Sequence, residues 1–141
     1  MIKTEKLSKS FDALKAVDKV SLTIQDNSIF GLAGTNGAGK STLLRMLAGV
    51  LLPDRGRILI DEEDVYENPK IKQEIFFLPD TAYFYQNASM EDMARHYAIF
   101  YPKYDRQRFE ELTEKLGLDK KRKISTFSKG MKRQASLILG I

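Results

Sequence analysis

A glycine-rich loop that ends in lysine and serine is the segment of this sequence best suited to chemistry. Residues 34–41 read Gly-Thr-Asn-Gly-Ala-Gly-Lys-Ser and fit the pattern G-x-x-x-x-G-K-[ST] at every fixed position. Glycines let the backbone approach a ligand closely and adopt positive φ angles, so that successive N–H groups can converge on an anion. A polyphosphate requires such a set of donors. The residues expected to bind it are Gly34, Thr35, Asn36, Gly37, Ala38, Gly39, Lys40, Ser41 and Thr42.

Two side chains of this loop have separate expected roles. Lys40 supplies a point charge for the β- and γ-phosphates, and the hydroxyl of Ser41 can ligate Mg²⁺. ATP and Mg²⁺ are therefore the expected cofactors. To present these groups, the loop must follow a buried strand and open a helix whose positive dipole end faces the phosphates. The apolar run at 29–33 predicts that strand, and apolar residues at helical spacing over 43–51 predict the helix.

Other segments before residue 88 are rich in strand patterns. Apolar residues in short or alternating runs, bounded by turn clusters, predict further strands. The predicted strands are 2–7, 20–24, 57–60 and 75–78.

The pattern becomes helical after residue 88. Ser89 and Asp92 have the spacing of a capping box, Asp105 is a predicted N-cap and Gly117 a predicted C-cap. Ser128 is expected to cap a last helix running to Ile141. The sequence thus predicts an α/β chain with an ATP-binding core over 1–88 and a helical subdomain over 89–141.

Bulk composition limits the classes of protein that fit. The chain has 141 residues, a net charge of +4 and no cysteine. It has no disulfide framework or thiolate metal site, and it lacks the basicity of a dedicated nucleic-acid binder. No apolar run approaches the roughly 20 residues that span a bilayer, so we expect a soluble chain that meets a membrane only through a partner.

With the loop in place, the whole chain resembles the ATP-binding subunit of an ABC transporter. Residues 9–17, Lys-Ser-Phe-Asp-Ala-Leu-Lys-Ala-Val, look like the family's adenine-stacking loop. The resemblance implies that Phe11 stacks on adenine and that Val17 packs near the sugar. Residues 127–134, Phe-Ser-Lys-Gly-Met-Lys-Arg-Gln, stand at the place of the family signature. By resemblance, the fold is a P-loop NTPase of ABC type, with an N-terminal β-subdomain, a partial core sheet and an α-helical subdomain.

The signature-like segment has a physical rationale of its own. A helix that begins with a hydroxyl and free N–H groups presents its positive dipole end outward. In the family, this surface binds the γ-phosphate of ATP held by a second protomer. Without the P-loop upstream, the same residues would describe an ordinary capped amphipathic helix. The resemblance assigns the contact to Ser128, Lys129, Gly130 and Met131.

Three positions depart from the family pattern. Asp80 stands where the family has the Q-loop glutamine, and it could reach Mg²⁺ through a water or be a solvated loop carboxylate. Lys129 replaces a signature glycine and is expected to point to solvent. Met131 replaces the signature glutamine and cannot make that side chain's contact.

The acidic pair of the family's Walker B strand and its switch histidine are also expected to be absent. His96, the only histidine, lies upstream of the signature and is expected to be a surface residue. No catalytic residue is therefore assigned. We expect a chain truncated before Walker B that binds nucleotide weakly without family-like hydrolysis. The segment at 29–33 is expected to lack the strands that flank it in the family.

By resemblance, the partners are a transmembrane permease and a second ATP-binding subunit, at the cytoplasmic face of the cell membrane. The favoured function is powering transport, with no nucleic acid bound. A soluble ABC ATPase acting on ribosomes or DNA is the alternative, and another P-loop NTPase such as a kinase is disfavoured by the signature-like segment. The aromatic residues of 76–85 are expected to be core plus partner-facing surface, 120–123 a solvated basic loop, and 61–64 an exposed acidic turn.

Overall fold

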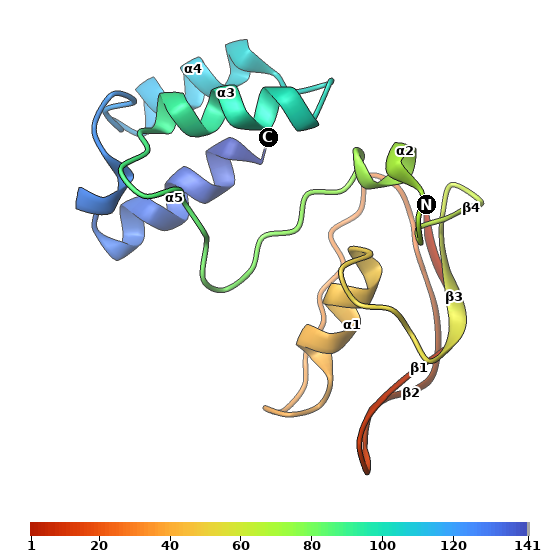
Figure 1. Cartoon of the computed structure of the whole chain (residues 1–141). Coiled ribbons are helices and arrows are strands. Elements are labelled where there is room, and N and C mark those ends of the chain that lie inside the picture. The colour runs from red at the N-terminus through yellow and green to blue at the C-terminus, as the bar shows by residue number, and fades with distance from the viewer. Residues whose placement is uncertain (141) are drawn as a thin grey trace. The chain divides into compact units, whose positions relative to one another are not determined.

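The computed structural model describes residues 1–140 and contains two compact units, Met1–Phe77 and Leu78–Ile141 (Figure 1). Phe84, in the segment that begins the second unit, packs against the helical cluster that follows it. Among the described residues, no helix has the length and apolar character needed to cross a membrane.

The first unit is built on an antiparallel sheet. β1 pairs with β2 on one edge and with β3 on the other, in the order β2-β1-β3-β4. The strands are β1 Ile2–Phe11, β2 Leu14–Ile24, β3 Arg55–Ile60 and β4 Glu63–Asp64. The strands predicted over 2–7, 20–24 and 57–60 are confirmed, and the first two extend into a long hairpin.

Three register shifts interrupt that hairpin, and two of them contain a lysine with a left-handed backbone. Lys6 and Lys19 have φ angles of 48° and 51°, in the left-handed region that side chains other than glycine rarely occupy. The N–H of Lys6 donates to Ser21 Oγ at 2.8 Å, and the N–H of Lys19 donates to Ser8 Oγ at 2.9 Å. These bonds satisfy donors that the broken ladder leaves free, and they offset a backbone strain of about 1–2 kcal/mol at each lysine.

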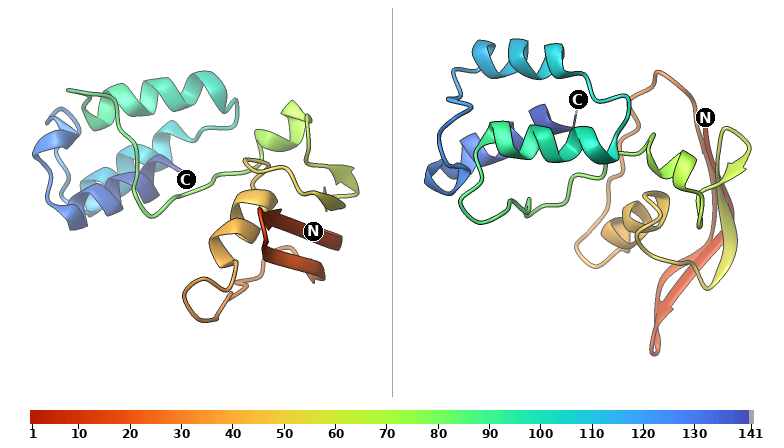
Figure 2. Two further views of the ribbon diagram at one scale, coloured as in Figure 1. Left: turned by 60° about the horizontal axis from the view of Figure 1, so that its bottom comes forward. Right: turned by 45° about the horizontal axis from the view of Figure 1, so that its top comes forward.

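The core of the first unit lies between the sheet and α1, Lys40–Leu47 (Figure 2). Leu43 and Met46 of α1 are buried against Leu7 and Ile58 of the sheet. A short helix, α2, Pro69–Lys72, adds Ile71 to the same cluster. α1 ends near Leu47, earlier than the expected residue 51.

The strands predicted at 29–33 and 75–78 are wrong, since neither segment has regular secondary structure. Ile29 is fully exposed and Phe30 is half exposed. A strand forms only where neighbours accept and donate its backbone hydrogen bonds. Among residues 1–140 no strand pairs with either run, so their apolar character alone cannot make them strands.

The second unit is helical. α3, α4 and α5 pack against one another around a core to which Met93, Phe109 and Ile138 contribute (Figures 1 and 2). The helices are α3 Met90–Phe100, α4 Arg106–Lys115 and α5 Lys129–Leu139, with a 3₁₀ turn, η1, at Ile124–Thr126.

The predicted helix ends are confirmed by their hydrogen bonds. Asp105 Oδ1 accepts from Arg108 N at 2.8 Å, and Ser128 Oγ accepts from Met131 N at 3.2 Å. The C-cap residue of α4 is Leu116, one residue before the predicted Gly117, which has a left-handed φ of 63°. The predicted end of α5 at Ile141 lies outside the described residues. Local capping chemistry thus sets these boundaries.

The capping box of α3 predicts a pH-dependent stability. Asp92 accepts hydrogen bonds from the N–H and the hydroxyl of Ser89, at 2.9 and 2.7 Å, and Arg95 pairs with it. These contacts lower the pKa of Asp92 from 3.8 to about 2. Because the folded chain has the lower pKa, the unfolded chain takes up the proton first as the pH falls. The contribution of Asp92 is therefore complete above its unfolded pKa of 3.8 and is lost as the pH falls towards about 2.

An Asp92→Ala variant isolates this effect. We expect it to melt at a lower temperature than the parent at neutral pH, measured by the helical circular dichroism signal. The difference should shrink through the acid range and vanish near pH 2. Glu114→Ala, at an exposed position on α4, is the control and should show no such convergence. A difference that stays constant with pH would contradict the assignment.

Candidate functional site

The glycine-rich loop leads directly into α1. Gly37 and Gly39 both have φ 84°, and Gly39 is the N-cap residue of the helix. The N–H of Ala38 donates to the Thr35 carbonyl at 3.2 Å, closing a turn, and Leu43 N–H donates to the Gly39 carbonyl at 2.9 Å. No side chain caps α1, so the N–H groups of its first turn remain available for an anion.

Lys40 lies folded back over this loop. Its ammonium donates to the carbonyl oxygens of Gly34 and Thr35, each at 2.7 Å. These two bonds hold the cation beside the N-terminus of α1, where the helix dipole adds to its field. The loop backbone, the Lys40 ammonium and the free N–H groups of α1 together form a positively charged phosphate cradle. Ser41, which is adjacent and exposed, fits the role of a hydroxyl ligand to a phosphate-bound Mg²⁺.

Strand β2 supports the loop from behind. A Cβ atom added at Gly39 would lie 1.9 Å from the carbonyl oxygen of Ala16 and 3.5 Å from Val17 Cγ2. Val17 is only 6% exposed. It therefore packs beneath the loop and presents little surface of its own. The carbonyl of Ala16 makes this close approach. The sequence could not predict it, because any residue type can supply a backbone carbonyl.

Phe11 stands at the end of β1, in the turn that joins it to β2. Its side chain is 46% exposed, and the ammonium of Lys9 lies 5.8 Å from the ring centroid. Lys9 is itself held by Asp54 at 2.7 Å, and this pairing lowers the pKa of Asp54. The turn and the glycine-rich loop lie at the same end of the unit (Figure 1). An exposed ring at this end is suited to stacking on a base.

The other predicted site residues belong to the second unit. Asp80 lines a pocket of about 300 Å³ together with the basic face of α5, formed by Lys129, Lys132 and Arg133. Lys129 is exposed, in agreement with its predicted orientation towards solvent. Lys132 and Arg133 were not predicted as neighbours of Asp80, although their i+3 and i+4 spacing from Lys129 places all three on one helix face.

The signature-like residues open α5. Ser128 uses its hydroxyl oxygen to cap the helix, and Gly130 follows in the first turn. Met131 packs against the helical core, so its side chain belongs to the unit's interior. The structure therefore shows a capped helix start with Ser128 and Gly130 exposed at its surface.

The aromatic residues near residue 80 divide between core and surface. Phe84 packs against the helical core, whereas Tyr83 and Tyr85 are exposed. His96 Nε2 lies 2.7 Å from the hydroxyl of Tyr85, which makes His96 part of this aromatic surface.

The charged runs are engaged in local ion pairs. Lys120 pairs with Glu110, and Glu63 pairs with Lys70 at 2.6 Å. Among residues 1–140, no group of three acidic, histidine or cysteine side chains is arranged to hold a metal ion.

Comparisons with known proteins agree on one family. A family model described as "ABC transporter" matches residues 17–141. The ABC transporter ATP-binding protein YtrB of Bacillus subtilis is 36% identical over 139 residues, which cover 99% of this chain and 48% of YtrB. The bacitracin transport ATP-binding protein BcrA of Bacillus licheniformis is 31% identical over 97% of this chain and 46% of its own length. The chain thus spans about half the length of these relatives.

A solved structure shows the same fold. The putative ABC transporter ATP-binding protein from Pyrococcus furiosus superposes with a TM-score of 0.82 at 28% identity, over 98% of this chain and 68% of that one.

Proposed function

The chain belongs to the ABC transporter family of ATP-binding proteins, and from this premise we propose that its glycine-rich loop binds Mg·ATP as part of a transport ATPase. The observation that carries the proposal is the position of Lys40, whose ammonium is fixed by two loop carbonyls beside an uncapped helix N-terminus. A multiply charged phosphate chain is the ligand that such an arrangement stabilises best.

Each part of the ligand has a proposed partner. The backbone N–H groups of 34–42 and the Lys40 ammonium bind the phosphates, and Ser41 ligates Mg²⁺. Mg²⁺, when bound, offsets phosphate charge. Phe11 stacks on the adenine, with Val17 packed under the loop near the sugar. Asp80 is proposed as the residue at the Q-loop position, with a water-mediated contact to the metal.

The whole protein is proposed to act with other subunits. A helix start such as that of α5, with Ser128 and Gly130 at its surface, suits the γ-phosphate of ATP bound to a second ATP-binding subunit. A transmembrane permease is the proposed second partner, and the cytoplasmic face of the cell membrane the proposed location. YtrB and BcrA, as an ABC transporter and a bacitracin transport ATP-binding protein, support this reading.

These assignments give the two parts of the chain different proposed functions. We propose 1–88 as the ATP-binding core and 89–141 as the helical subdomain carrying the signature. For a polypeptide of these 141 residues alone, we propose nucleotide binding without family-like turnover, because no side chain assigned here activates water.

The proposal predicts that Phe11 contributes directly to affinity. Phe11→Ala should weaken Mg·ATP binding by about tenfold, since stacking of a base on an aromatic ring contributes about 1–3 kcal/mol. Isothermal titration calorimetry with Mg·ATP measures the effect. Leu14→Ala, which removes the exposed residue paired with Phe11 across the turn, should leave affinity unchanged. Binding of inorganic triphosphate, which has no base, should be equal in the parent and in Phe11→Ala. An equal loss for both ligands would contradict the stacking role.

A further inference from the structure

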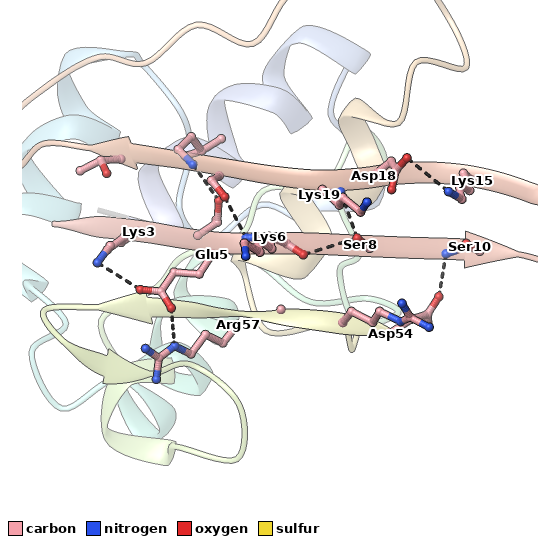
Figure 3. Close-up of a pocket in the computed structure, with 16 residues that line it drawn as sticks. Lys3, Glu5, Lys6, Ser8, Ser10, Lys15, Asp18, Lys19, Asp54 and Arg57 are labelled. Carbon is pink, nitrogen blue, oxygen red and sulfur yellow. Dashed lines mark hydrogen bonds and ion pairs between the residues drawn. The ribbon is translucent and has the colours of Figure 1, made fainter.

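The outer face of the β-sheet carries an open pocket that is lined mainly by charged and polar residues (Figure 3). Strands β1, β2 and β3 line a cavity of about 1450 Å³ with 16 residues, of which Leu22 is the only large apolar one and none is aromatic. The face has no part in the proposed ATP site, whose loop and helix lie elsewhere in the unit.

Cations outnumber carboxylates on this face. Six cationic and three acidic side chains line the cavity, so its net charge is +3 in a chain whose net charge is +4. The cations are Lys3, Lys6, Lys15, Lys19, Arg55 and Arg57. All three carboxylates are already neutralised by neighbours: Glu5 pairs with Arg57 and Lys3, Asp18 with Lys15, and Asp54 with Lys9. The excess positive charge is therefore not balanced within the face.

Three cations carry this excess, and they surround one serine. Among residues 1–140, the side chains of Lys6, Lys19 and Arg55 have no hydrogen-bond or ion-pair partner. Lys6 precedes Ser8 on β1, the Lys19 N–H donates to Ser8 Oγ, and Arg55 is the β3 residue paired with Ser8. Figure 3 shows Lys6 and Lys19 beside Ser8 in the middle of the face.

Backbone strain coincides with two of these three cations. Lys6 and Lys19 are left-handed residues at two of the three register shifts, and a serine hydroxyl of the facing strand accepts from the N–H of each. Bulges of this kind redirect a side chain, and strained residues cluster where a surface binds a ligand. The bulges thus set the positions of Lys6 and Lys19 on this face.

The chemistry of the lining selects among anionic ligands. The cavity exceeds the roughly 300–1,000 Å³ typical of small-molecule sites, which favours an extended ligand. Single-stranded nucleic acid is recognised by stacking on aromatic rings, and none is present here. Lys6, Lys19 and Arg55 are all exposed, so an extended chain laid along the strands can reach each of them. Carboxylates on an extended chain can meet the three cations, while the O–H groups of Ser10 and Ser21 can donate to its peptide carbonyls.

We propose that this face binds an acidic polypeptide segment, with Lys6, Lys19 and Arg55 as the residues that pair with its carboxylates. The ligand is a partner segment rich in Asp and Glu, bound independently of ATP. The site therefore adds a protein-binding surface to the nucleotide-binding function.

Fluorescence anisotropy of a labelled oligoglutamate peptide, at low ionic strength, tests the proposal. The triple variant Lys6→Gln, Lys19→Gln, Arg55→Gln should bind about tenfold more weakly, because each exposed ion pair contributes little and three act together. The matched control is Lys115→Gln, Lys121→Gln, Arg133→Gln in the second unit, which removes the same charges and should bind as the parent does. Lys40→Ala should also bind the peptide normally, which separates this site from the ATP site.

Other outcomes would overturn the proposal. Equal weakening in both triple variants would mean that net charge alone attracts the peptide. Binding of oligothymidylate or of phosphatidylserine vesicles that depends on the three cations, without peptide binding, would assign the face to another class of ligand. Circular dichroism verifies that each variant is folded. If the triple variant is not, Arg55→Gln alone provides the same comparison, because Arg55 has an ordinary strand backbone.

Discussion

Replacing Lys40 by alanine is expected to weaken Mg·ATP binding by about 100-fold, since bonds between a charged donor and phosphate oxygens contribute about 1.5–3 kcal/mol. The ammonium now donates to the Gly34 and Thr35 carbonyls at 2.7 Å, so it is already in place beside the N-terminus of α1. Its removal takes away the strongest point charge of the cradle. It also frees the two carbonyl oxygens, whose partial negative charge then faces the phosphates.

Calorimetric titration with Mg·ATP measures this effect. Arg45→Ala removes an equal charge from the last turn of the same helix, and we expect it to change affinity by less than about twofold because solvent screens exposed charges at this distance. A similar loss in both variants would mean that ATP responds to net charge and not to the cradle. Unchanged binding in Lys40→Ala would remove the basis for the proposed function.

The elements predicted best from the sequence are those whose geometry is set within a few residues. Ser89, Asp105 and Ser128 each cap a helix as predicted, since a side chain three residues from its N–H partner needs no tertiary help. The loop at 34–41 behaves in the same way. The glycines of the loop permit its positive φ angles, and Lys40 donates to a carbonyl within the same loop. The spacing of these residues was therefore enough to locate the candidate site.

Features that depend on distant partners could not be predicted. The runs 29–33 and 75–78 are apolar, but a strand also needs neighbours for its hydrogen bonds, and residue type does not report them. The bulges at Lys6 and Lys19 arise from the offset of one strand against another. No glycine marks either position, so the pattern gave no sign that two lysines would be strained.

Replacing Gly39 by alanine is expected to lower both the stability of the chain and its affinity for ATP. The new Cβ would lie 1.9 Å from the Ala16 carbonyl oxygen. Alanine would also have to adopt the φ of 84° seen at Gly39, which is strained for any residue with a side chain. Strain and overlap together should lower the free energy of unfolding by about 3 kcal/mol. Since Gly39 is also the N-cap residue of α1, its displacement moves the N–H groups that bind phosphate. Urea unfolding and Mg·ATP calorimetry measure the two effects.

Gly37 provides the control that separates strain from close packing. Its φ is also 84°, but a Cβ there would meet no atom within 4 Å. Gly37→Ala should therefore lower the free energy of unfolding by only about 1 kcal/mol, the cost of the backbone conformation alone. The difference between the variants then measures the contact between β2 and the loop. If both alanines destabilise the chain equally, the loop tolerates the overlap by shifting away from Ala16, and the support of the phosphate site by β2 is weaker than its geometry implies.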